Sequence, residues 1–104
     1  MKNDKYRKSD RAFLNQDGFH EDATISWEMS VNDGGWGDGS LRIRDCSDTI
    51  NLSIDFHDEA YVKNTQYKID TLIKVLKGLR KELPHAHAAL LTAQLEKAKN
   101  EKKK

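Results

Sequence analysis

The longest hydrophobic pattern in the 104-residue chain runs from Asp58 to Leu83 and has the period of an α-helix. Apolar side chains recur at three- and four-residue intervals on one side of this segment, whereas lysines take the other side. Such a stripe is typical of a helix that packs on another element. Asp58 suits the N-cap, because its carboxylate can accept hydrogen bonds from the free amides of the first turn.

Upstream of this segment, apolar and polar side chains alternate with the period of two that is typical of strands with one buried face. The alternation is strict over residues 23–31 and returns over 41–45 and 49–57. Four glycines between Asn32 and Ser40 indicate a flexible connection between the first two of these strands. Short connections favour an antiparallel meander.

Pro84 lacks the amide proton that a continuing helix needs, so the long helix is predicted to stop near Leu83 and a second helix to cover about 84–99. The fold class predicted is therefore α+β: a three-stranded antiparallel meander packed by a long amphipathic helix of about 58–83 and followed by a second C-terminal helix. Residues 1–12 are interpreted as a flexible N-terminal tail, residues 13–104 as a single domain, and the last lysines as a frayed end.

Charge is segregated along the sequence although the formal net charge is only +1. Residues 1–12 carry +3, residues 13–60 carry −9 and residues 61–104 carry +7. This distribution predicts an acidic sheet with acidic loops, and basic helices.

No pattern in the chain predicts catalysis, a cofactor or a metal ion. Cys46 could pair with His20 or His57 as nucleophile and base, but no surrounding motif supports that pairing, and a small side chain at a strand end is the favoured interpretation. The two histidines of His85-Ala86-His87 point in different directions on a helix, so they do not form a ligand pair.

Trp36, flanked by glycines, either folds back on the sheet as a lid or stays exposed as an anchor for a protein partner, since tryptophan is enriched in interface hot spots. Exposure is favoured slightly, because Trp27, Met29 and Val31 already supply core side chains. Carboxylates in the two acidic loops complete the predicted partner-binding set: Asp17, Glu21, Asp22, Asp33 and Asp38. We expect this set to dock on a basic surface of a larger bacterial protein. The alternative is a nucleic-acid-binding protein that uses the helix lysines Lys63, Lys74, Lys77 and Lys81.

The run from Phe19 to Phe56 resembles small uncharacterised accessory proteins of bacteriophages, above all in Leu41-Arg42-Ile43-Arg44-Asp45-Cys46-Ser47 and Asn51-Leu52-Ser53-Ile54-Asp55-Phe56. The segment from Lys68 to Leu76 resembles the helix that follows in them. The resemblance implies a phage-encoded inhibitor of a host or bacterial-defence protein, and it carries over no catalytic residue.

Three further expectations concern the setting of the chain. Its single cysteine excludes an internal disulfide, and no apolar run is long enough for a bilayer, so a cytoplasmic protein without membrane contact is expected. Open strand edges and a narrow seam of Leu91, Leu95 and Ala98 indicate a homodimer.

Overall fold

A computed structural model describes residues 4–19 and 23–102 of the chain. The chain divides into two units, Met1–Gln66 and Tyr67–Lys104, and each is described by itself. The first unit holds a β-sheet and the start of a helix, and the second holds the rest of that helix.

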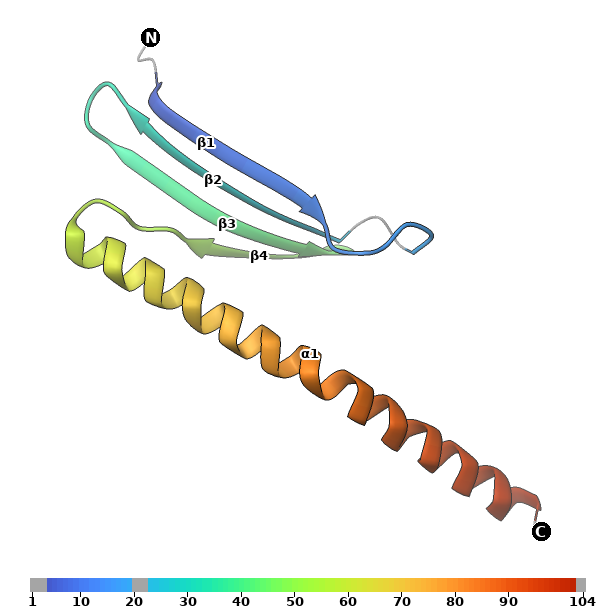
Figure 1. The fold of residues 1–104 in the computed structure, drawn as a ribbon. Coiled ribbons are helices and arrows are strands. Elements are labelled where there is room, and N and C mark those ends of the chain that lie inside the picture. The colour runs from blue at the N-terminus through green and yellow to red at the C-terminus, as the bar shows by residue number, and fades with distance from the viewer. Residues whose placement is uncertain (1–3, 20–22, 103–104) are drawn as a thin grey trace. The chain divides into compact units, whose positions relative to one another are not determined.

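The sheet has four strands, so the prediction of a three-stranded meander is wrong (Figure 1). They are β1 (Asp4–Phe13), β2 (Thr24–Asn32), β3 (Gly37–Asp45) and β4 (Asp48–Ser53). Each pairs antiparallel with the next, in the order β1-β2-β3-β4. The meander topology was therefore predicted correctly for β2 to β4.

The additional strand, β1, consists of residues that were predicted to form a flexible tail, so that prediction is wrong for residues 4–12. Eight of its positions pair in unbroken register with β2, from Tyr6 opposite Val31 to Phe13 opposite Thr24. Backbone hydrogen bonds rather than buried side chains hold such a strand, so its charged sequence shows no apolar alternation. Charged residues of this kind are common on edge strands, where they oppose pairing with other chains.

One face of the sheet is apolar and the other is polar. Register places Ile25 and Trp27 of β2 beside Ile43 and Leu41 of β3 on the apolar face. The side chains of this face are half-buried, and Ala23, just before β2, is buried. Arginines and hydroxyl-bearing residues occupy the opposite face.

The helix α1 (Glu59–Lys102) is 44 residues long and continues through Pro84, so the prediction of two separate helices is wrong (Figure 1). The proline removes one hydrogen bond and strains one turn, at a cost of about 3 kcal/mol. Residues on both sides of it are mostly leucine, lysine, alanine and glutamate, which favour the helix strongly enough to extend it past this position.

The start of α1 agrees with the N-cap prediction, because Oδ1 of Asp58 accepts a 2.9 Å hydrogen bond from the amide of Tyr61. Further along the first unit, Thr65 is buried, and its hydroxyl donates a 2.6 Å hydrogen bond to the carbonyl oxygen of Asp55. This bond fixes the first two turns of α1 against the segment that follows β4. No helix in the described part of the chain has the length and apolar character that a membrane span requires.

Candidate protein-binding site

The hairpin loop between β2 and β3, residues 33–36, is called the tip loop and is built around Asn32. Its side-chain Oδ1 accepts hydrogen bonds from the amides of Gly34, at 2.9 Å, and Trp36, at 3.1 Å. The backbone of Asn32 closes the loop as well, since its amide donates to the carbonyl oxygen of Trp36 and its carbonyl accepts from Gly35. Gly35 has a φ of +80°, a conformation in which a larger residue is strained. The glycine-rich sequence therefore forms a defined turn rather than the flexible connection that we expected.

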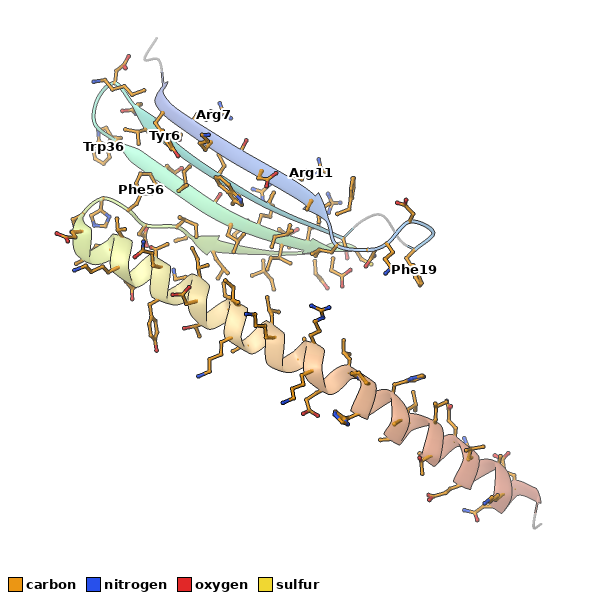
Figure 2. The ribbon with its side chains drawn as sticks, in the orientation of Figure 1. Tyr6, Arg7, Arg11, Phe19, Trp36 and Phe56 are labelled. Carbon is orange, nitrogen blue, oxygen red and sulfur yellow. The ribbon has the colours of Figure 1, made fainter. Side chains whose placement is uncertain are left out.

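Trp36 lies at the tip of this turn with 74% of its surface exposed (Figure 2). Its backbone is held at both the amide and the carbonyl, whereas the indole has no aromatic partner among the described residues. A large side chain on a fixed backbone loses little additional entropy when a partner covers it. The structure thus gives Trp36 the exposure that the predicted anchor requires.

The carboxylates predicted to surround Trp36 are divided between the two ends of β2. Asp33 is in the tip loop and Asp38 is at the start of β3, so both are exposed close to Trp36 in sequence and in space. Asp17 is in the connection between β1 and β2, at the far end of a nine-residue strand that is about 30 Å long. The structure does not bring Asp17 to the tip. Glu21 and Asp22 lie outside the described residues.

A second acidic segment, which was not among the predicted site residues, reaches the tip end of the sheet. After β4, the amide of Ile54 donates to the carbonyl oxygen of Gly39, and the Phe56 ring approaches the position that a Cβ on Gly37 would take. Residues 54–56 therefore run beside the start of β3. They include one further carboxylate, Asp55, and lead directly into two more, Asp58 and Glu59. The third predicted strand, residues 49–57, already contained Asp55. Only the contacts with β3 show that this segment reaches the end of the sheet where Trp36 lies.

The sheet itself is not acidic, contrary to the expectation from the −9 segment. Because β1 joins it, the four strands together carry six basic residues (Lys5, Arg7, Lys8, Arg11, Arg42 and Arg44) and six acidic ones (Asp4, Asp10, Glu28, Asp38, Asp45 and Asp48). The excess of negative charge is confined to the connections.

The two arginines of β3 lie on the polar face of the sheet and have no acidic neighbour in register. Arg42 lies between Ser26 and Asn51, and Arg44 lies between Thr24 and Thr49. Glu28 forms an ion pair of 3.0 Å with Arg7 of β1. Without β1 in the predicted sheet, this partner could not be identified.

The lysines of the alternative site all belong to α1. Lys63 lies 3.6 Å from Glu59, one turn earlier, so part of its charge is already balanced. Lys74, Lys77 and Lys81 are exposed and follow one another at helical spacing, with Asp70 on the same side. Nucleic-acid binding by this surface stays a prediction.

The geometry keeps Cys46 apart from His57, one of the two histidines considered as its catalytic partner, and the other, His20, lies outside the described residues. Cys46 is exposed in the turn between β3 and β4, whereas His57 follows the other end of β4. The six residues of β4 keep them about 20 Å apart. His57 instead stacks on Tyr61, with ring centroids 4.0 Å apart.

Among residues 4–19 and 23–101, no cluster of three or more histidine, cysteine, aspartate or glutamate side chains is arranged to hold a metal ion. The described surface therefore offers an exposed anchor and charged groups for contact with another molecule. Comparisons of this chain with protein-family models, with curated proteins and with solved structures find no match.

Proposed function

We propose that the chain is a non-enzymatic protein-binding module that docks its β2–β3 tip on a basic surface of a larger bacterial protein. The observation that carries the proposal is the 74% exposure of Trp36 on a turn whose backbone Asn32 holds. A phage-encoded inhibitor of a host or bacterial-defence protein would use such a surface to cover its target.

The charge around the tip supports a basic partner. Asp33 and Asp38 flank the indole in sequence, and the segment from Asp55 to Glu59 adds carboxylates at the same end of the sheet. Opposite charges on two surfaces accelerate their encounter, and the acceleration falls as salt screens them. The apolar anchor would then supply the affinity and the carboxylates the rate of association.

The test is affinity capture from a bacterial lysate with the full chain, followed by titration of the purified partner. We expect Trp36→Ala to weaken the complex by about 30-fold, because hot-spot tryptophans contribute about 2 kcal/mol or more. Phe19→Ala is the matched control, since Phe19 is 69% exposed but lies in the β1–β2 connection, at the other end of β2 (Figure 2).

Charge variants locate the docking end of the sheet. Asp33→Asn with Asp38→Asn should slow association, whereas Asp17→Asn should leave it unchanged. Equal affinity of the parent and Trp36→Ala, or an association rate that does not fall with added salt, would contradict the proposal.

A further inference from the structure

The polar face of the sheet brings three arginines together at the end that lies away from Trp36. Two cross-strand rows form this group. In the first, Arg11, Ser26, Arg42 and Asn51 lie side by side across β1 to β4. In the second, Phe13, Thr24, Arg44 and Thr49 do so. We call these two rows the arginine face.

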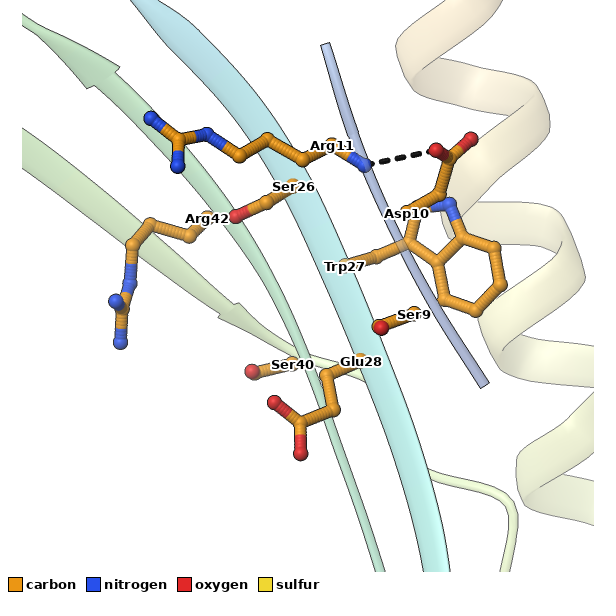
Figure 3. Close-up of a pocket in the computed structure, with 8 residues that line it drawn as sticks. All are labelled: Ser9, Asp10, Arg11, Ser26, Trp27, Glu28, Ser40 and Arg42. Carbon is orange, nitrogen blue, oxygen red and sulfur yellow. Dashed lines mark hydrogen bonds between the residues drawn. The ribbon is translucent and has the colours of Figure 1, made fainter. Parts of the chain in front are cut away.

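The arginine face is hollowed. A depression of about 450 Å³ is lined by seven of its residues: Arg11, Thr24, Ser26, Arg42, Arg44, Thr49 and Asn51. A second depression of about 420 Å³ shares Arg11, Ser26 and Arg42 with it and continues along the strands to Ser40 and Glu28 (Figure 3). The two depressions form one open strip over the polar side of the sheet.

No carboxylate lines the first depression, and no ion pair occupies its arginines among the residues that the structure describes. Nε of Arg42 donates to Oδ1 of Asn51 at 3.1 Å, and Nε of Arg44 donates to the carbonyl oxygen of Cys46 at 3.3 Å. These bonds use only one nitrogen of each guanidinium, so the terminal nitrogens stay available to a ligand. Two carboxylates line the second depression: Glu28 is paired with Arg7, and Oδ1 of Asp10 accepts a hydrogen bond from the backbone amide of Arg11.

The spacing of the three guanidinium groups suits a ligand with repeated negative charges. Arg42 and Arg44 are two residues apart on one face of β3, about 7 Å along the strand, and Arg11 and Arg42 are two strands apart, about 10 Å across the sheet. Guanidinium matches the geometry of phosphate oxygens, and hydroxyl and amide side chains contact phosphate and sugar. An enclosed small-molecule site would not continue as an open strip.

An exposed aromatic ring completes the surface. Phe13 is 65% exposed at the end of the second row, and the Arg11 guanidinium lies 5.5 Å from its ring centroid. Aromatic rings beside cationic grooves act as stacking platforms for unpaired bases. We propose that the arginine face binds the backbone of a single-stranded nucleic acid, with Phe13 available to stack on a base.

This site is independent of the proposed docking of Trp36. The arginine face and the tip loop are at opposite ends of β2, and none of the residues proposed for one site belongs to the other. It also differs from the lysine surface of α1. Variants can therefore test each surface without altering the others.

The experiment measures the fluorescence anisotropy of a labelled single-stranded oligonucleotide titrated with the full chain. Binding is measured at several salt concentrations, and the salt slope is the fall in the logarithm of the association constant per unit rise in the logarithm of the salt concentration. Three phosphate contacts predict a salt slope near 2, or about 20-fold weaker binding when salt rises from about 50 mM to 200 mM. Arg42→Gln and Arg44→Gln should each reduce the slope by about 0.7. Arg42→Lys with Arg44→Lys should keep the slope but lower the affinity, which separates lost charge from lost folding.

Matched controls remove charge or an aromatic ring elsewhere. Lys8→Gln, which changes the other face of β1, and Trp36→Ala should leave oligonucleotide affinity unchanged. No binding at 50 mM salt, or tighter binding of a triply phosphorylated peptide, would overturn the proposal. So would binding that survives both glutamine substitutions and is lost when Lys74, Lys77 and Lys81 become glutamate, since that result would assign nucleic-acid binding to α1.

Discussion

Gly39 lies where a neighbouring backbone leaves no room for a side chain. A Cβ at this position would stand 2.8 Å from the carbonyl oxygen of Ile54, and the amide of Ile54 donates to the carbonyl oxygen of Gly39. At Gly37 the neighbour at 2.8 Å is an edge atom of the Phe56 ring. The two glycines thus let residues 54–56 approach β3 and carry acidic side chains to the tip. Their role depends on a contact across the sheet, so the sequence predicted them only as loop residues.

Gly39→Ala is expected to lower the free energy of unfolding by about 1–3 kcal/mol, because a backbone atom cannot move aside as readily as a ring. Gly37→Ala should cost less, since the Phe56 ring can rotate. Denaturant unfolding of the two variants beside the parent measures the difference. A larger loss for Gly37→Ala than for Gly39→Ala would show that the ring, and not the backbone, is the rigid neighbour.

At the scale of elements, hydrophobic periodicity predicted the strands and the helix that have one apolar face, and it did not predict the strand that lacks one. Alternation located β2, β3 and β4 to within a few residues, and the stripe after Asp58 located the start of α1. In β1, only Tyr6 and Ala12 contribute apolar groups to the face that holds Trp27. Backbone hydrogen bonds with β2 therefore form this strand, and a hydrophobic pattern cannot predict such bonds.

The same distinction applies to the two candidate binding surfaces. Trp36 could be identified from composition alone, because an indole among glycines and carboxylates is unusual. The arginine face could not, since it requires Arg11 of β1 to lie in one row with Arg42. Because β1 was not predicted from the sequence, the arginine face could not be predicted either.

The continuity of α1 through Pro84 can be tested by removing the proline. Pro84→Ala should raise the melting temperature of α1 and stabilise the helix by about 3 kcal/mol, because it restores the hydrogen bond to the carbonyl of Arg80 and relieves a clash. Far-ultraviolet circular dichroism during heating measures the change. His85→Ala, at the next position, should alter stability by less than about 1 kcal/mol. A lower helix content in Pro84→Ala would mean that the proline begins a separate helix after all.

At the scale of the whole molecule, the described part of the second unit consists of helix alone and cannot bury its own apolar stripe. Because α1 is uninterrupted, this stripe continues past Pro84 at alternating steps of three and four residues: Ile69, Leu72, Leu76, Leu79, Leu83, Ala86 and Leu90. Most of these side chains are exposed. At 100° per residue, Leu91 of the predicted dimer seam lies about a quarter turn from this stripe, and Leu95 lies more than a third of a turn from it.

A repeat of seven residues sustained over three heptads is the pattern by which helices supercoil around each other. We therefore expect the homodimer to form through this stripe rather than through Leu91, Leu95 and Ala98. Sedimentation equilibrium of the full chain should give the mass of two 11.9 kDa chains. Leu76→Glu with Leu83→Glu should give the mass of one, because buried charge in such a seam has no partner. Tyr67→Glu, on the side of α1 away from the stripe, should leave the dimer intact. A parent chain that sediments as a monomer at every concentration would exclude a homodimer by either seam.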